Sequence, residues 1–405
     1  MMNKMKIYFL QMNSSSSSIY EGKIKHQIKV FEDFCKLNND RVLFVSKDIS
    51  CNPRNRIINT GNGNVYFYYS HNKVLGLIFR VYNRFIANLI LYRRIRQYII
   101  KNNISFLYVR RSGTVDNEFI KFLKNVKSHD VRIIYDIPTF PYDGEMVKGS
   151  LQEKIDKKYR GYLRKYVDIV VTPSPQDGAK DILGMPYLVI QNGLIVSEIK
   201  QSKANRYEDD TIHAIAVSSL KKWHGYERFI KGLSSYYLQG GKRNIVFHIV
   251  GGDEDNLFFK QYINIINELR LEKHVVMHGN RFGEELDDIY DKCNIGISSL
   301  GLHRIGLNRS TALKCGEYIS RGLPVYSSTI IDIFPPNYEY VGYDKPGEDP
   351  IDIFSFVSFY DSVYMGNDYN VVHEEIKNSA TLICDMHFYM RPLLNWIEKE
   401  NESND

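Results

Sequence analysis

Cysteine is scarce in this chain, and the few cysteines present are widely scattered. There are five in 405 residues, with no C-x-x-C pair and no spacing typical of a zinc site. An odd, dispersed set of this kind argues against a disulfide scaffold and favours a reducing compartment. We therefore expect a cytoplasmic location and a stability that comes from hydrophobic burial.

Uninterrupted apolar runs are short. Nowhere does the sequence reach the roughly 18 consecutive apolar residues that span a bilayer. The apolar run within residues 4–10 is shorter than that of a secretory signal peptide. We therefore expect no membrane-spanning helix, and we expect any membrane contact to be peripheral, at the inner face of the membrane.

The charge balance is slightly basic, with a formal net charge of +6. Basic residues cluster in 80–96, 154–165 and 221–228. Such clusters suit weak binding to anionic lipid head groups or phosphorylated substrates, although solvated helix faces are the more common explanation. They do not alternate with aromatic residues on a recognisable module, so no nucleic-acid partner is expected.

The chain is too long for one typical core, which favours two domains. Short apolar segments alternate with amphipathic helical segments in both halves, a pattern typical of parallel α/β sheets. We predict an α/β fold with two Rossmann-like domains, residues 1–197 and 212–373, joined by a polar linker, 198–211. A helical tail, residues 374–405, follows, and we leave open whether it crosses back to the first domain. The predicted strands are 6–10, 41–46, 106–110, 132–136, 169–172, 187–190, 212–217, 245–250, 275–278, 295–298 and 324–327.

Four loops in the second half follow predicted strands, where open α/β sheets bind their ligands. They are residues 218–225, 251–253, 278–281 and 308–325. The first carries two lysines and an imidazole, and the first three contain glycines that allow close backbone approach. One such loop alone is usually a turn, but four loops in succession after strands on one sheet edge predict a ligand site.

The last of these loops runs into a short predicted helix. Ser310 or Thr311 is expected to cap its start with a hydroxyl, and Gly322 is expected to end it in the left-handed conformation before Pro324. The free N–H groups at such a start suit an anion such as a diphosphate. Glu317 would project from the helix about two turns further on.

This stretch carries a resemblance to a known family. Glu317 with residues 320–324 matches the end of an E-x7-E signature followed by A-x-G-x-P, and Lys314, Glu317 and Tyr318 reproduce a K-x-x-E-Y run. Residues 212–328 thereby resemble the nucleotide-sugar half of a family-4 retaining glycosyltransferase. The resemblance implies the GT-B fold, in which two Rossmann-like domains face a cleft.

The sequence departs from the family pattern at three positions. Arg309 stands where the signature has its first glutamate, and Ser219 and His224 stand where the family has a phosphate-binding arginine and lysine. Lys221 and Lys222 are candidates to replace the two missing cations.

The resemblance implies a set of site residues, carried over position by position. The catalytic group would be Glu317, whose family role is ribose binding, with Lys222 and His224. The donor would be bound by Gly22, Ser219, Lys221, Gly251, Gly279, Asn280, Arg309, Ser310, Thr311, Leu313 and Lys314.

A loop of the first half, residues 136–145, resembles the acceptor loop of a polysaccharide-type subgroup. Its prolines would hold it rigid, and its carboxylates would accept hydrogen bonds from sugar hydroxyls, although a solvated surface loop explains the same residues. The acceptor-binding candidates are Asp136, Thr139, Tyr142, Asp143 and Glu145.

The implied activity is transfer of a sugar from a nucleotide-diphosphate donor to a glycan or lipid-linked acceptor, with retention, in assembly of a bacterial capsule or lipopolysaccharide. Retention by front-face attack needs no pair of catalytic carboxylates, and none stands at a convincing spacing. Residues 253–255 have the letters of a metal-binding D-x-D motif but fit a solvated helix start better. No metal or other cofactor is therefore expected, the nucleotide sugar being a co-substrate.

Two other functions remain open. A sugar epimerase or a phosphorylase could use the same fold, and a phosphorylase would carry lysine-bound pyridoxal. The chain could also be a non-catalytic nucleotide- or sugar-binding protein, which the lost acid and lost cations favour.

Overall fold

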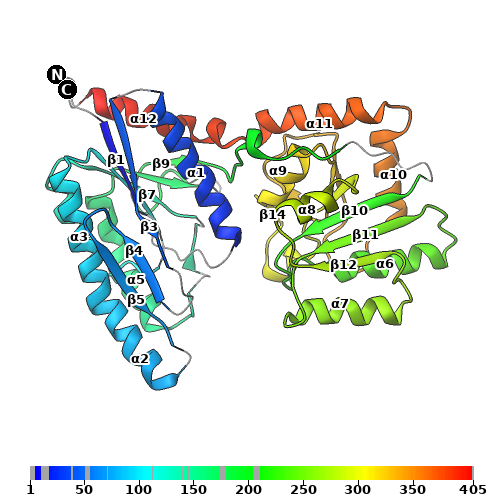
Figure 1. The fold of residues 1–405 in the computed structure, drawn as a ribbon, viewed down its shortest axis with the longest axis horizontal. Helices are drawn as coiled ribbons and strands as arrows, with labels where there is room; N and C mark the ends of the chain where they lie inside the picture. Colours follow the sequence, from blue (N-terminus) through cyan, green and yellow to red (C-terminus); the bar gives the residue numbers. More distant parts are fainter. Residues whose placement is uncertain are drawn as a thin grey trace. The chain divides into compact units, whose positions relative to one another are not determined.

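The structure is a computed structural model that describes residues 5–10, 18–37, 40–50, 55–70, 72–111, 113–138, 140–143, 146–173, 179–203 and 210–403. The chain forms two compact units (Figure 1). Unit 1 comprises Met1–Gln191 and Tyr389–Asp405, and unit 2 comprises Asn192–Phe388.

Unit 1 contains a six-stranded parallel sheet in the order β2-β1-β6-β7-β8-β9. Its central strands are continuous apolar runs because helices cover both faces of a parallel sheet. The strands are β1 (Met5–Leu10), β2 (Arg41–Val45), β6 (Phe106–Arg110), β7 (Arg132–Asp136), β8 (Ile169–Thr172) and β9 (Tyr187–Val189).

A small antiparallel sheet is inserted between β2 and β6, formed by β3 (Lys47–Asp48), β4 (Asn55–Asn59) and β5 (Asn64–Tyr68). The remaining elements of unit 1 are helical. They are α1 (Ser18–Lys36), α2 (Lys73–Tyr82), the π-helical turn η1 (Asn83–Ala87), α3 (Asn88–Lys101), α4 (Asn117–Lys127), α5 (Leu151–Tyr159) and the 3₁₀ helix η3 (Arg160–Lys165).

The segment α2–η1–α3 is one continuous helix, with a face of apolar side chains outside the core. Within the described part of the chain, this helix, Lys73–Lys101, is long and apolar enough to cross a membrane by length and composition, yet only 11% of its apolar window is buried. The helix contains no uninterrupted apolar run of that length, because Arg80 and Arg84 lie within it.

The last helix, α12 (Met386–Glu402), returns to unit 1. Arg41 of β2 forms an ion pair of 2.7 Å with Glu398, and Arg132 of β7 forms one of 2.9 Å with Glu400. Trp396 lies edge-on to Phe106. The helical tail therefore does cross back to the first domain.

Unit 2 contains a second six-stranded parallel sheet, in the order β12-β11-β10-β13-β15-β17. Numbered within the unit, this is the 3-2-1-4-5-6 order of a Rossmann domain. The strands are β10 (Ile212–Val217), β11 (Ile245–Val250), β12 (Val275–Gly279), β13 (Ile295–Ile297), β15 (Val325–Ser327) and β17 (Val341–Tyr343).

Helices cover both faces of this sheet, with α6 and α7 on one side and α9 and α11 on the other (Figure 1). The predicted α/β fold with two Rossmann-like domains is confirmed. The other elements of unit 2 are η4 (Val196–Glu198), α6 (Tyr226–Leu238), α7 (Leu257–Glu268), α8 (Gly283–Tyr290), η5 (Leu302–Ile305), β14 (Arg309–Ser310), α9 (Leu313–Ser320), β16 (Ile330–Ile331), α10 (Ile353–Tyr364) and α11 (Tyr369–Ile383).

Candidate functional site

The strand order of unit 2 reverses between β10 and β13, which is where open α/β sheets bind ligands. The loops after these two strands meet there. The N–H of Leu300 donates to the carbonyl of His224 at 2.7 Å, and the N–H of Gly301 donates to that of Trp223 at 3.2 Å. Gly225 permits the contact, because a Cβ there would lie 2.8 Å from the Gly301 nitrogen.

The loops after β10, β11 and β12 also converge, through the predicted glycines. Gly251 has φ +119°, and a Cβ at this position would lie 1.7 Å from the carbonyl oxygen of Ser218. The Gly251 N–H donates to the Gly279 carbonyl at 2.7 Å. The Asn280 amide donates to Asp253 at 3.3 Å. The sequence pattern therefore identified loops that lie side by side in the folded unit.

The predicted cap of α9 is wrong, although its end is as expected. Ser310 lies in strand β14, which pairs with β16, so the chain stays extended until Ala312, and no side chain caps the helix. The Thr311 hydroxyl instead accepts from the Asn192 amide at 2.9 Å. Gly322 has φ +87° just beyond the helix. With no side-chain cap, the first N–H groups of α9 are available to an anion.

Lys314 and His224 form the polar centre of this edge. The Lys314 ammonium donates to the Tyr226 hydroxyl at 3.1 Å, and the His224 ring stacks on Tyr226. Burial, together with the charges of Lys314 and Lys221, lowers the pKa of His224 to about 2. His224 is therefore neutral, and because its Nδ1 accepts from the Lys221 N–H at 2.9 Å, its Nε2 carries the hydrogen.

The other predicted phosphate-side residues are more open. Ser219, Lys221 and Lys222 are exposed, and Leu313 is half-buried at the first turn of α9. Gly22 lies within α1 of unit 1. The neutral His224 can offer a hydrogen bond but no positive charge. The positive charge of the site comes instead from Lys314, whose ammonium is held in place by its hydrogen bond to Tyr226.

Glu317 lies on α9 beside a buried arginine. Its carboxylate is 3.4 Å from Arg321, whose guanidinium also pairs with Asp287 at 2.8 Å. Burial outweighs the attraction of Arg321 and raises the pKa of Glu317 above its ordinary value. The side chain keeps 27% of its surface exposed, while Arg321 holds its carboxylate.

Arg309, where the family has an acid, is a surface residue. Its side chain is 67% exposed, and its Nε donates to Asp332 at 2.6 Å. Asp332 directly follows β16 and donates its N–H to the Ser310 carbonyl. Arg309 therefore pairs with an acid 23 residues away in the sequence, which no local pattern could indicate.

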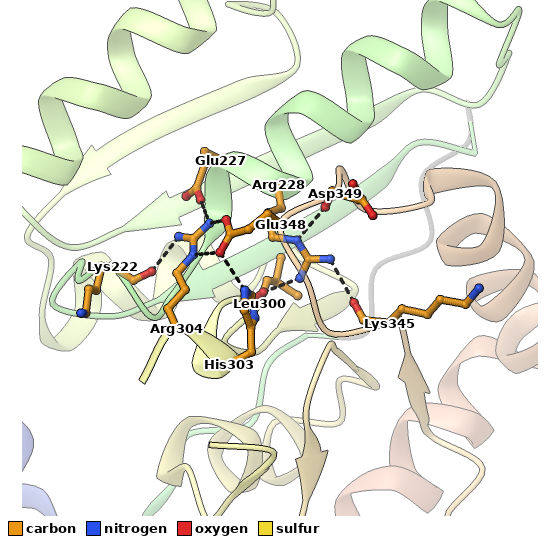
Figure 2. A network of polar contacts seen from close by, with 9 residues as sticks. All are labelled: Lys222, Glu227, Arg228, Leu300, His303, Arg304, Lys345, Glu348 and Asp349. Carbon is orange, nitrogen blue, oxygen red and sulfur yellow. Dashed lines mark hydrogen bonds and ion pairs between the residues drawn. The ribbon is translucent and has the colours of Figure 1, made fainter. Parts of the chain in front are cut away.

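Two arginines that the sequence analysis missed hold the loops in position (Figure 2). Arg304 donates to the Lys222 carbonyl at 2.8 Å and pairs with Glu227 and Glu348. Hydrogen bonds from Arg304 and His303 lower the pKa of Glu348 to about 2. The network therefore ties the loop that carries Lys222 to two distant segments.

The second of these arginines, Arg228, is 2% exposed and donates to three backbone carbonyls (Figure 2). Its acceptors are Leu300, Lys345 at 3.0 Å and Asp349 at 2.7 Å. These partners are 72, 117 and 121 residues away. Only the tertiary fold could therefore reveal the role of Arg228.

The predicted acceptor residues lie in unit 1, and those that are described already have protein partners. Asp136 is buried, 2.6 Å from Arg110. Tyr142 is buried and donates to Asp156 at 3.1 Å. Asp143 pairs with Arg160 at 3.0 Å. Thr139 and Glu145 lie outside the described residues.

Three histidines of unit 2 form a hydrogen-bonded row across neighbouring strands. His213 Nδ1 lies 2.9 Å from His248 Nε2, and His248 Nδ1 lies 2.9 Å from His278 Nε2. Burial and the neighbouring histidines lower the pKa of His248 to about 3, and burial with Arg281 and Lys292 lowers that of His278. Both shifts favour the neutral form of His248 and His278 in the folded state.

We expect unit 2 to lose stability as the pH falls below about 6.5, the ordinary histidine pKa of an unfolded chain. Between that value and about 3 the unfolded state binds more protons at His248 than the folded state does, which costs up to about 1.4 kcal/mol per pH unit. Urea unfolding can be followed through Trp223 in a Trp396→Phe background, since the chain has two tryptophans. His248→Asn should flatten this pH dependence and His129→Gln should not; equal slopes in both would contradict the assignment.

The geometry described above belongs to a chain with the GT-B fold. A glycosyltransferase from Rickettsia africae matches 98% of this chain over 99% of its own, with a TM-score of 0.61 and 13% identity. Anabaena HepE, solved with UDP and with UDP-glucose, matches 98% of this chain over 100% of its own, at TM-score 0.60 and 12% identity for the UDP complex. Sucrose-phosphate synthase from Thermosynechococcus elongatus matches 98% of this chain over 99% of its own, with a TM-score of 0.60 and 12% identity.

At these identities the likeness establishes the fold. No protein-family model matches the chain, and no curated protein matches it.

Proposed function

We propose that the protein is a glycosyltransferase that binds a nucleotide-diphosphate sugar at the loop edge of unit 2. The observation that carries this proposal is the convergence of three features at the switch point of the sheet: the glycine loops, the uncapped start of α9 with Lys314, and Glu317 about one turn further along the same helix. HepE, which shares the fold, was solved with UDP and UDP-glucose.

In this site the leaving diphosphate would face the first N–H groups of α9 and the Lys314 ammonium. Fixed N–H groups and a fixed cation stabilise the negative charge that develops as the nucleotide leaves. The neutral His224 would donate its Nε2 hydrogen to a phosphate or sugar oxygen, and Glu317 would accept hydrogen bonds from the ribose hydroxyls.

We further propose that transfer proceeds with retention and without a metal or other cofactor. The leaving phosphate would take the proton of the acceptor hydroxyl as the new glycosidic bond forms on the same face of the sugar. The acceptor would be a glycan or a lipid-linked glycan of a bacterial surface polysaccharide, and the enzyme would work on the cytoplasmic side of the membrane.

Donor binding tests the proposal directly. A thermal-shift screen over UDP-, GDP- and ADP-sugars should raise the melting temperature with one nucleotide class, because a ligand at 100 times its Kd stabilises the folded state by about 2.7 kcal/mol. Lys314→Met should weaken that donor about tenfold or more, while Lys260→Met, which removes an exposed lysine of α7, should not. The absence of a shift with every donor would overturn the proposal.

A non-catalytic binding protein is the second candidate, and one observation favours it. Arg309 occupies the position of an acid that contacts the donor sugar in the family, and it is paired with Asp332. Calorimetric binding of a nucleotide sugar, with neither transfer nor hydrolysis over a broad panel of acceptors, would support this candidate instead.

A further inference from the structure

The helix α2–η1–α3 of unit 1 presents an apolar stripe outside the core. Eight of its large apolar side chains are between 47% and 69% exposed. They are Val74, Leu75, Leu77, Ile78, Val81, Phe85, Ile86 and Leu89. A contiguous surface of this kind marks an interaction site rather than an ordinary solvated helix.

The C-terminal part of the same helix packs into the core of unit 1, whereas α2 has no buried residue. Ala87, Leu91, Ile95 and Ile99, spaced four residues apart, are buried. A helix packed in this way cannot leave the unit to cross a bilayer. Its exposed stripe can only lie along a surface, as in interfacial amphipathic helices.

The charge of the helix indicates which kind of surface it meets. Residues 73–101 include seven basic residues and no acidic residue. The basic residues are Lys73, Arg80, Arg84, Arg93, Arg94, Arg96 and Lys101. Exposed apolar side chains next to arginines complement an anionic bilayer. The apolar side chains enter its hydrophobic interior, and its anionic head groups attract the arginines.

The same helix forms one wall of a cavity of about 330 Å³. Arg80, Arg84, Asn88 and Tyr92, again four residues apart, line it. The π-helical turn η1 lies at this wall, where the Asn83 side chain bonds the Tyr68 backbone at 3.0 and 2.7 Å. One helix thus carries both the apolar stripe and two arginines of the cavity.

Three more arginines line the cavity from the body of the unit. Arg110 ends β6 and Arg111 follows it, beside the point where the strand order of this sheet reverses, and Arg56 lies on β4. Arg56 is held by Asp48 at 2.8 Å and Arg110 by Asp136 at 2.6 Å. Among the described lining residues the one acid is Asp116, which caps α4.

Five arginines around one cavity form a site for a phosphate or diphosphate group, because guanidinium groups bind phosphate oxygens in a forked geometry. We propose that α2 and η1 seat unit 1 on an anionic bilayer, and that the arginine cavity takes the phosphate group of a membrane lipid. If the proposed function holds, this lipid would also carry the acceptor sugar. The docking itself does not depend on it.

Vesicle sedimentation of the full chain tests the proposal. We expect binding to vesicles of phosphatidylcholine mixed with phosphatidylglycerol, weaker binding to phosphatidylcholine alone, and release by salt. Phe85→Ser with Leu89→Ser should lower the partition coefficient about tenfold on both vesicles. Arg80→Ala with Arg84→Ala should remove the preference for phosphatidylglycerol.

Two matched controls remove similar groups elsewhere. Leu238→Ser changes a leucine of α6 that is 85% exposed, and Lys154→Ala with Lys158→Ala removes two exposed charges of α5. Both should bind vesicles like the unchanged chain. An equal loss in the controls would overturn the proposal.

Three other results would also overturn it. The first is that the chain binds inorganic pyrophosphate, measured by calorimetry, but binds none of the vesicles. The cavity would then be a site for a soluble phosphate. The second is a change from dimer to monomer in the Phe85/Leu89 variant, since the stripe would then face a second copy. The third is loss of the unfolding transition in that variant. The thermal shift with the nucleotide-sugar donor is measured on the same protein. Failure of the proposed function and failure of membrane docking are therefore separate outcomes.

Discussion

Replacing Gly251 by alanine is expected to disrupt the loop edge of unit 2 and to abolish binding of a nucleotide sugar. The added Cβ would lie 1.7 Å from the carbonyl oxygen of Ser218, and the residue would keep a φ of +119°. Because the clashing atom belongs to the backbone, no side-chain rotation relieves the contact, and the loops after β10 and β11 must separate. We expect a loss of about 2–4 kcal/mol in the free energy of unfolding.

The measurement is urea unfolding followed through Trp223 in a Trp396→Phe background, together with the donor thermal shift. Gly240→Ala is the matched control, since Gly240 has φ +83° but no atom within 4 Å of the added Cβ. It should cost only about 1 kcal/mol, from backbone conformation alone. Equal losses at both positions would show that the contact between the loops is not what Gly251 provides.

The second large effect is expected at Glu317. Glu317→Ala should lower kcat/KM at least about 100-fold, equivalent to about 2.7 kcal/mol of transition-state stabilisation. The physical reason is that, under the proposed function, the carboxylate held by Arg321 at 3.4 Å would accept hydrogen bonds from the ribose hydroxyls of the donor, and alanine has no acceptor to replace it. Steady-state kinetics and calorimetry with the donor found by thermal shift measure the effect.

Two further variants separate binding from folding at this position. Glu317→Gln keeps the shape and one acceptor oxygen, so its loss should be smaller than that of alanine, with an unchanged unfolding transition. Glu268→Ala removes an exposed glutamate of α7 and should leave the kinetics unaltered. Unchanged kinetics in Glu317→Ala would remove Glu317 from the site.

The sequence analysis predicted the features that depend on local pattern. Buried parallel strands are short apolar runs separated by helical segments, so their positions along the chain could be identified from residue order alone. Glycines after strands marked the loops, and Gly251 and Gly279 do meet. The end of α9 was also predictable, because Gly322 needs no partner beyond its own backbone.

Where the sequence analysis was wrong or incomplete, a distant segment decided the outcome. The cap of α9 was misassigned because β16 pairs with β14 and keeps Ser310 extended. His224 stands where the family has a phosphate-binding lysine, and its burial beside Lys314 keeps it neutral, so that it can offer a hydrogen bond but no charge. Asp136 was expected to face an acceptor, yet Arg110 occupies its carboxylate.

The sequence by itself thus determined the two α/β domains, the order of their strands along the chain and the loops that contain the candidate donor site. Only the tertiary structure decided which groups hold those loops, as Arg228 does across 72 to 121 residues. It also decided that the apolar side chains of α2 and η1 stay outside the core while Arg80 and Arg84 line a cavity. The reason is physical: periodicity records which residues share a face, whereas burial, charge state and partners depend on segments that only folding brings together.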